Sequence, residues 1–247
     1  MQNENDFLEI LQEINNQIQV MSLETTGAIG EIVAQIILLK AFDNATDNLE
    51  ELKTLTVSSF LNSLLLPGLF EAIRDKLPKE VLGGLICFNH FIKKYDTLTE
   101  DDVKMDFIGR AAAGQFKNLT KAYDLFIPMI LEDNSLSQIL IQVKNSTSIS
   151  EKTIKIKMNE YKSENSINKT NFSILMSLTA GEAGVTINEE GDFLICKGLG
   201  CYNFNANVKA TLKEILDCDR NPLLSKKFDS NIIREVTYGS YSSDHKF

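Results

Sequence analysis

The feature that most constrains the fold of this chain is a change of hydrophobic period near Ala122. Upstream of this residue, apolar side chains recur at intervals of three or four, as they do on one face of a helix. Downstream, residues 123–131 and 136–144 form two apolar runs typical of strands, separated by the turn sequence Glu132-Asp-Asn-Ser135. The pattern predicts a β-hairpin preceded by helices.

The elements on either side of the hairpin follow from the same periodicities. Before it we expect helices over about 7–18, 25–40, 57–77 (with a break at Pro67) and 101–117, while 81–95 fits either a helix or a strand. After it we expect a lysine-rich helix capped by residues 145–148, strands at 172–178 and 193–196, and a last helix at 208–216. This order predicts an α/β fold in which helices flank a mixed central β-sheet.

Composition excludes several classes of protein. The apolar runs are far shorter than the ~20 residues of a membrane span, and the acidic N-terminus does not resemble a signal peptide. We therefore expect an intracellular protein, in the cytosol or the nucleus, without membrane contact. Four Cys without a CxxC pair and only two His argue against a disulfide scaffold, a zinc site and a Ser/His/Asp triad.

The distribution of charge indicates where partners would bind. A net charge of −9 argues against a general nucleic-acid coat protein. Residues 1–110 hold 9 Lys and Arg against 18 Asp and Glu, whereas the rest of the chain holds 16 of each. Residues 144–169 carry six Lys against three Glu, so a polyanion would bind there. The acidic helical half is the candidate surface for a protein partner or a homodimer.

The hairpin is predicted to bring three polar side chains together. If it folds about residues 133–134, Asp124 lies opposite residues 142–144 and shares a face of the sheet with Gln142 and Lys144. An acid and a lysine at the ends of apolar strands cost free energy unless they pair or bind something. A divalent metal ion with a phosphate would satisfy both. The alternative is a salt bridge between Asp124 and Lys144, with Gln142 facing solvent.

Phosphodiester hydrolysis requires these residue types. Hard oxygen ligands hold Mg²⁺ beside the scissile phosphate, and a cation helps to activate water and offsets the developing charge. Asp124 would be the anionic ligand, Gln142 a neutral carbonyl ligand and Lys144 the activating cation. Glu31, which interrupts an apolar helix, is the candidate for a further ligand; the alternative is that Glu31 pairs with Arg110 or a lysine.

This arrangement resembles the PD-(D/E)XK nuclease superfamily. In that superfamily an Asp opens the second core strand, a Glu, Asp or Gln two residues before a Lys closes the third, and an acid often lies on the first helix. The segments Gly30-Glu31-Ile-Val-Ala, Phe88-Asn-His-Phe91, Gly109-Arg-Ala-Ala-Ala113, Asp124-Leu-Phe-Ile-Pro128 and Ile139-Leu-Ile-Gln-Val-Lys-Asn145 are similar to a divergent branch attached to Crinkler-type and mobile-element-linked proteins.

The resemblance implies a single domain, 1–247, with a restriction-endonuclease-like core. Residues 1–24 would be an N-terminal helical extension, 25–180 the core with a helical insertion at about 45–100, and 181–247 the C-terminal strands and helix. The implied activity is Mg²⁺- or Mn²⁺-dependent hydrolysis of DNA, rather than RNA, with Glu31, Asp124 and Gln142 as metal ligands.

Two departures from the superfamily pattern leave other functions open. Tyr123 stands where the superfamily has Pro, and Gln142 replaces the second acid, which removes a negative charge from the metal site. A catalytically inactive module that binds nucleic acid or protein is therefore one alternative, and a purely structural or interaction protein is another. Lys152 and Lys155, with Lys157, would form a track for a nucleic-acid backbone or simply a solvated helix face.

Overall fold

The computed structural model describes residues 4–20, 26–46, 55–94, 106–116, 123–145, 150–164, 171–179 and 181–217. Its helical elements are α1 (Glu4–Val20), α2 (Thr26–Thr46), α3 (Val57–Leu64), α4 (Pro67–Arg74), α5 (Lys79–Gly83), η2 (Ile108–Arg110), α7 (Glu151–Glu164), η3 (Leu199–Cys201) and α8 (Ala206–Asp217). Its strands are β1 (Leu55–Thr56), β2 (Leu85–Ile86), β3 (His90–Lys94), β4 (Ala112–Phe116), β5 (Leu125–Ile130), β6 (Leu136–Lys144), β7 (Phe172–Ser177), β8 (Gly184–Ile187) and β9 (Phe193–Lys197).

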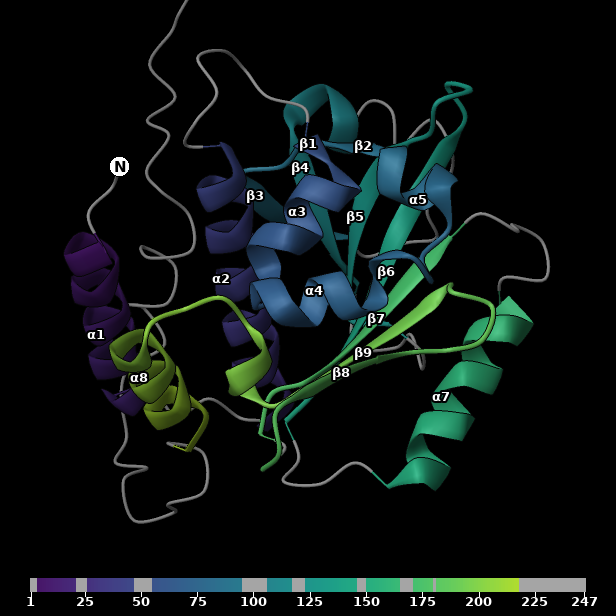
Figure 1. Ribbon diagram of the computed structural model, residues 1–247. Helices are drawn as coiled ribbons and strands as arrows, with labels where there is room; N and C mark the ends of the chain where they lie inside the picture. The colour runs from purple at the N-terminus through teal and green to yellow at the C-terminus, as the bar shows by residue number, and fades with distance from the viewer. Residues whose placement is uncertain are drawn as a thin grey trace, which may run out of the picture.

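The strands form one mixed sheet with a branch. Its main order is β1-β2-β5-β6-β7-β9-β8, and β6, β7 and β9 run parallel while β5 and β6 form an antiparallel hairpin (Figure 1). The branch arises because one edge of β5 pairs with two strands. β4 pairs with its first residues and β2 with its last, and among the described strands β3 is paired with β4 alone. The predicted α/β class with a mixed sheet flanked by helices is confirmed.

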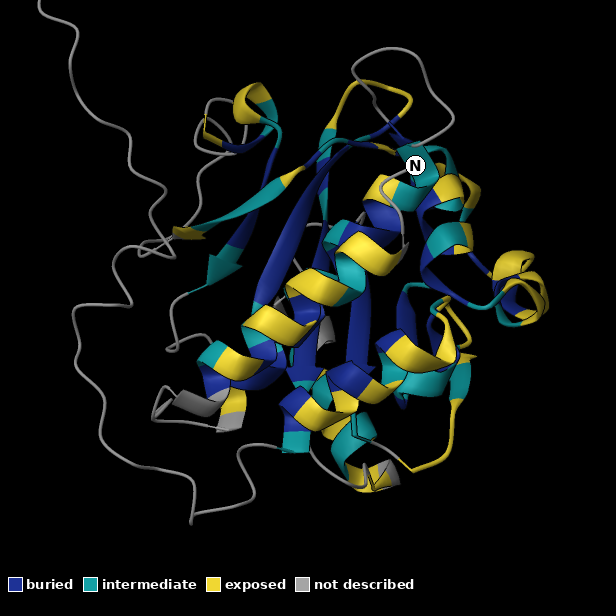
Figure 2. Cartoon of the chain, turned by 90° about the vertical axis from the view of Figure 1, so that its left-hand side faces the viewer, coloured by how far each residue is buried: buried dark blue, intermediate teal, exposed yellow. Residues whose placement is uncertain are grey.

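Helices cover both faces of the sheet, but unequally. The larger core lies between the sheet and α1 to α5 with α8; in Figure 2 the dark blue strands lie behind helices whose outer faces are exposed. The smaller core lies on the opposite face, where Ile154 and Met158 of α7 pack against residues such as Phe126 and Leu140. Because both faces are covered, β5 and β7 consist almost entirely of buried residues, as in the interior of a layered α/β domain.

Most of the predicted elements are confirmed. Pro67 separates α3 from α4 and occupies the first turn of α4, where its missing N–H is not needed. The ambiguous segment 81–95 divides into the end of α5 and the strands β2 and β3, so the stretch at about 45–100 supplies strands as well as helices. The lysine-rich helix is present as α7, although the cap found is Ser150, whose Oγ accepts a hydrogen bond from the N–H of Thr153 at 3.1 Å, rather than one of residues 145–148.

The helix predicted over 101–117 is wrong, because this stretch contains η2 and the strand β4. Alanine favours helices, but here pairing with β3 and β5 overrides local propensity. Gly114 shows the reason most directly: a Cβ at this position would lie 1.9 Å from Cε1 of Phe126. The absence of a side chain at Gly114 allows the Phe126 ring to lie against the backbone of β4, and this contact helps to hold β4 beside β5. Within the described ranges, no helix combines the length and apolarity needed to cross a bilayer.

Candidate functional site

The candidate site lies at one end of two interior strands of the sheet, where β5 begins and β6 ends. The hairpin ladder ends at the pair Leu125 with Ile141, and the N–H of Asp124, just before β5, donates to the Ile141 carbonyl at 2.8 Å, which keeps Asp124 next to the end of the ladder and within hydrogen-bonding reach of Gln142. The prediction that the hairpin brings Asp124 and Gln142 together is confirmed by the hydrogen bond between their side chains. The hairpin register is set by the turn, where Asp133 Oδ1 accepts a hydrogen bond from the N–H of Ser135 at 2.9 Å.

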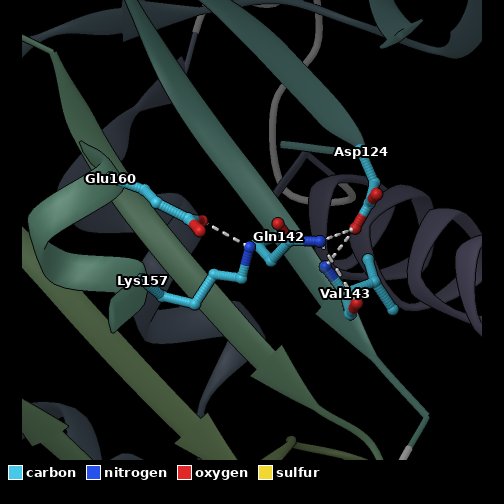
Figure 3. Close-up of polar contacts among 5 residues, drawn as sticks. All are labelled: Asp124, Gln142, Val143, Lys157 and Glu160. Carbon is cyan, nitrogen blue, oxygen red and sulfur yellow. Dashed lines mark hydrogen bonds and ion pairs between the residues drawn. The ribbon is translucent and has the colours of Figure 1, made fainter. Parts of the chain in front are cut away.

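Two donors converge on a single oxygen of Asp124. The Val143 N–H donates to Oδ2 at 2.6 Å, and Nε2 of Gln142 donates to the same oxygen (Figure 3). Burial raises the pKa of Asp124 above its usual range, although the Val143 N–H, the charge of Lys144, the Gln142 amide and the charge of Lys157 all act in the opposite direction. The carboxylate is therefore held in place but costly to ionise.

Glu31 reaches the same region from α2. Its Oε2 accepts a hydrogen bond at 2.5 Å from Nε2 of Gln115 on β4. Of the alternative partners, Arg110 or a lysine, the structure therefore does not give Arg110, whereas Lys93 is near enough for its charge to act on Glu31. Burial raises the pKa of Glu31, and the negative charge of Asp124 raises it further, while Gln115 and Lys93 lower it. The carboxylate of Glu31 thus lies within electrostatic range of the charge of Asp124.

Gln142 is the least expected member of the site. Its side chain is 6% exposed, so the alternative of a solvent-facing amide is wrong. Nε2 is used by Asp124, but the buried Oε1 has no hydrogen-bond partner among the described residues. Leaving a buried carbonyl oxygen without a hydrogen bond costs about 1–3 kcal/mol of folding free energy. The hydrogen bond from Nε2 to Asp124 therefore sets the orientation of the amide, at the expense of Oε1.

Lys144 lies at the end of β6, next to this cluster. Its charge lowers the pKa of Asp124, but no ion pair to a carboxylate is present within the part of the chain that the structure describes. The alternative of a hairpin salt bridge between Asp124 and Lys144 is therefore not what the structure contains. The ammonium group stands near the carboxylate without being neutralised by it.

The lysines of α7 differ in orientation. Lys152 and Lys155, the predicted nucleic-acid contacts, are exposed on the outer side of the helix. Lys157 instead turns inward: its side chain is 12% exposed and forms an ion pair with Glu160 at 2.5 Å beside Gln142 (Figure 3). Lys157 follows the packed Ile154 by three residues and so lies on the same face of α7, whereas Lys152 and Lys155 do not.

The donor set suits a hard divalent cation. Two carboxylates and an amide oxygen are the kind of ligands that Mg²⁺ takes together with several waters. No cluster of three or more His, Cys, Asp and Glu side chains that could hold a metal ion occurs among the described residues, so a metal site here would rest on Glu31, Asp124 and the orphaned Oε1 of Gln142. Gln115 is the site residue that the sequence analysis missed, because it lies in the stretch predicted to be a helix.

Comparison with known proteins places the chain in a family without assigning an activity. No curated protein and no solved structure matches it. A family model described as a domain of unknown function (DUF8736) matches residues 3–177, a stretch that contains Glu31, Asp124, Gln142 and Lys144. Because this match covers well over half of the chain, the protein belongs to the DUF8736 family.

Proposed function

We propose that this edge of the sheet is a metal-dependent phosphodiesterase site acting on DNA. The observation that carries the proposal is that two half-buried carboxylates, Glu31 and Asp124, lie within electrostatic range of each other, and that Asp124 contacts an amide whose buried oxygen has no partner among the described residues. Burial raises the pKa of both carboxyl groups, and the negative charge of Asp124 raises the pKa of Glu31 further. A bound divalent cation would remove the repulsion and satisfy the amide oxygen together.

Glu31, Asp124 and Gln142 would hold Mg²⁺ or Mn²⁺ with water in the remaining positions. Gln142 can offer Oε1 only if its amide turns over, because Nε2 now faces Asp124. When bound, such an ion polarises a phosphoryl oxygen and lowers the pKa of a coordinated water. With Gln142 in place of an acid the site should bind the metal ion more weakly, so we expect tight binding only when a phosphate completes the coordination of the ion.

Lys144 supplies the cation that the reaction needs beside the attacking water. Since no carboxylate among the described residues pairs with it, its ammonium group is available to orient a water molecule and to offset charge on a phosphorane-like transition state. Lys157 is placed to add positive charge from the α7 side, and its ion pair with Glu160 holds it there. DNA is the expected substrate, and Lys152 and Lys155 on the outer side of α7 would meet its backbone.

The experiment that tests the function combines calorimetry with a cleavage assay. Mn²⁺ should bind the wild-type protein and should fail to bind Asp124→Asn, and cleavage of plasmid DNA in Mn²⁺ should be lost in both Asp124→Asn and Lys144→Met. Glu80→Gln, which removes an exposed acid on α5, is the matched control and should bind and cleave as the wild type does. Unchanged cleavage by Asp124→Asn would overturn the proposal.

A catalytically inactive nucleic-acid-binding module is the second candidate, and one observation favours it. The amide of Gln142 gives Asp124 a hydrogen bond that needs no metal, so the substitution of an acid by Gln stabilises the empty site. This candidate predicts DNA binding without cleavage in either Mg²⁺ or Mn²⁺. It also predicts that Gln142→Glu brings metal binding that the wild type lacks.

A further inference from the structure

The sheet carries a second polar row, one step beyond Asp124 and Gln142. β6, β7 and β9 are parallel neighbours, so their carboxyl ends lie at the same edge (Figure 1). The register pairs Lys144 with Ser177 and Ser177 with Lys197. These three residues, the last of their strands, form a straight row across the sheet, which we call the Lys-Ser-Lys row.

All three members of the Lys-Ser-Lys row are on the face that carries α7. Side chains alternate along a strand, and Leu140, Leu175 and Ile195, at even spacing from the row, belong to the smaller core on that face. Adjacent strands lie about 4.8 Å apart, so the Cα atoms of the two lysines are separated by roughly 10 Å. Both ammonium groups can therefore reach a single phosphate or two successive ones.

Ser177 provides an independent sign of a ligand. Its side chain is 0% exposed, and its hydroxyl has no hydrogen-bond partner among the described residues. Ser173 on the same face is also buried and unpartnered, but it lies between Leu140 and Phe193, whereas Ser177 lies between two lysines. An anionic oxygen is the group to which the Ser177 hydroxyl and both ammonium groups could all donate hydrogen bonds.

The lysines are not neutralised within the protein. Neither Lys144 nor Lys197 forms an ion pair with a carboxylate of the residues that the structure describes, and both are only partly exposed. Gly184, the residue of β8 paired with Lys197, adds no side chain, and a Cβ there would have nothing within 4 Å. The space beside Lys197 is thus open on the side away from Ser177.

We infer that the Lys-Ser-Lys row binds a backbone phosphate of a nucleic-acid strand next to the phosphate at Asp124. The inference rests on the proposed function for the strand's position, but not on cleavage. Gln142, which contacts Asp124, is two residues before Lys144 and is its nearest neighbour along β6 on the same face. A nucleic-acid strand that crosses the ends of β6, β7 and β9 would therefore pass from Asp124 to the row. Lys197 and Ser177 would position the strand, and Lys144 would serve both places.

Binding in EDTA tests the row apart from the metal site. The fluorescence anisotropy of a labelled DNA duplex and of the matching single strand is measured against salt, with wild type, Lys197→Met, Ser177→Ala and the control Lys213→Met on the exposed side of α8. Loss of one phosphate contact should lower the salt slope by about 0.7–0.9, which corresponds to roughly fivefold to eightfold weaker binding at 0.1 M salt. Lys197→Met should show both changes and Lys213→Met neither.

Ser177→Ala distinguishes a ligand contact from a structural role. Removing an unpaired buried hydroxyl should leave the thermal stability unchanged or higher, while DNA affinity falls several-fold. Loss of both stability and affinity would assign Ser177 to the fold and overturn its part in the row.

Two further outcomes separate this inference from the proposed function. Unchanged affinity and salt slope in Lys197→Met, or no DNA binding by the wild type in EDTA, would overturn the row whatever the metal titration shows. Conversely, a row that binds DNA in a protein that never binds Mn²⁺ would retain this inference and refute the phosphodiesterase. If inorganic phosphate binds as tightly as the DNA, the occupant is a free oxyanion, and the assignment to a backbone is wrong.

Discussion

Gln142→Glu is the substitution whose effect follows most directly from the structure. It introduces an acid two residues before Lys144, but it removes the amide that donates to Asp124 Oδ2. A hydrogen bond to a charged group contributes about 1.5–3 kcal/mol, and the new carboxylate would face Asp124 in a buried position. We expect the metal-free variant to be less stable than the wild type at neutral pH.

The size of this loss has an upper limit set by protonation. A new Glu with an ordinary pKa of about 4.3 can take up a proton at pH 7.5 at a cost of roughly 4 kcal/mol, and it can then donate to Asp124 as the amide does. At pH 5 the same protonation costs about 1 kcal/mol. The expected destabilisation is therefore about 2–4 kcal/mol at pH 7.5, or roughly 5–15 °C in melting temperature, and much less at pH 5.

Thermal unfolding in EDTA and in Mn²⁺ measures both parts of this prediction. A metal ion at a hundred times its dissociation constant returns about 2.7 kcal/mol, so Mn²⁺ should restore most of the stability that Gln142→Glu loses. Gln138→Glu adds the same charge to the same face of β6, four residues away from the site, and should show neither the pH dependence nor the rescue. A Gln142→Glu variant as stable as the wild type at pH 7.5 in EDTA would refute the reasoning.

Three further predictions concern charge and packing. The pKa of Glu31 is raised in the folded protein, so its ionisation destabilises the fold as the pH rises above the ordinary carboxyl range near 4; urea unfolding of Glu31→Gln should therefore show a gain over the wild type at pH 7 that vanishes at pH 4. Gly114→Ala should cost about 1–3 kcal/mol or more because its Cβ overlaps a Phe ring, whereas Gly68→Ala, where a Cβ meets nothing within 4 Å, should be neutral or stabilising in the same assay; equal effects would contradict the packing argument. Lys157→Met should raise the pKa of Asp124 in a carbon-13 NMR titration, and Lys152→Met should leave it unchanged.

The hairpin could be predicted because everything that specifies it is local. The turn residues between two apolar runs set the register, and the register brings Asp124, just before β5, next to Gln142 without any knowledge of the rest of the chain. The position of Glu31 beside Asp124 was inferred from the cost of an acid on an apolar helix. Both inferences concern which residues meet; what they bind remains a proposal.

The branch of the sheet could not be predicted, because the signal for it is not local. β4 reads as a helix by composition, and only its pairing with β3 and β5, together with the ring of Phe126 over Gly114, makes it a strand. Gln115 was missed for that reason. Ser177 and Lys197 were missed for a different reason. They are neighbours because β7 lies between β6 and β9, and the order of parallel strands in a sheet cannot be deduced from the sequences of the strands alone.

The branch also gives the site two halves of unequal stability. β4 is joined to β5 by two residue pairs, Gly114 with Phe126 and Gln115 with Leu125, whereas β6 shares six pairs with each of β5 and β7. The amide protons of β3 and β4 should therefore exchange with solvent through local openings that leave β6, β7 and β9 intact. Gln115 and its hydrogen bond to Glu31 belong to this weaker half, and Asp124 to the stronger one. An ion that bridged the two carboxylates would tie the halves together and slow exchange in β4, which makes the branch a reporter of occupancy that requires no substrate.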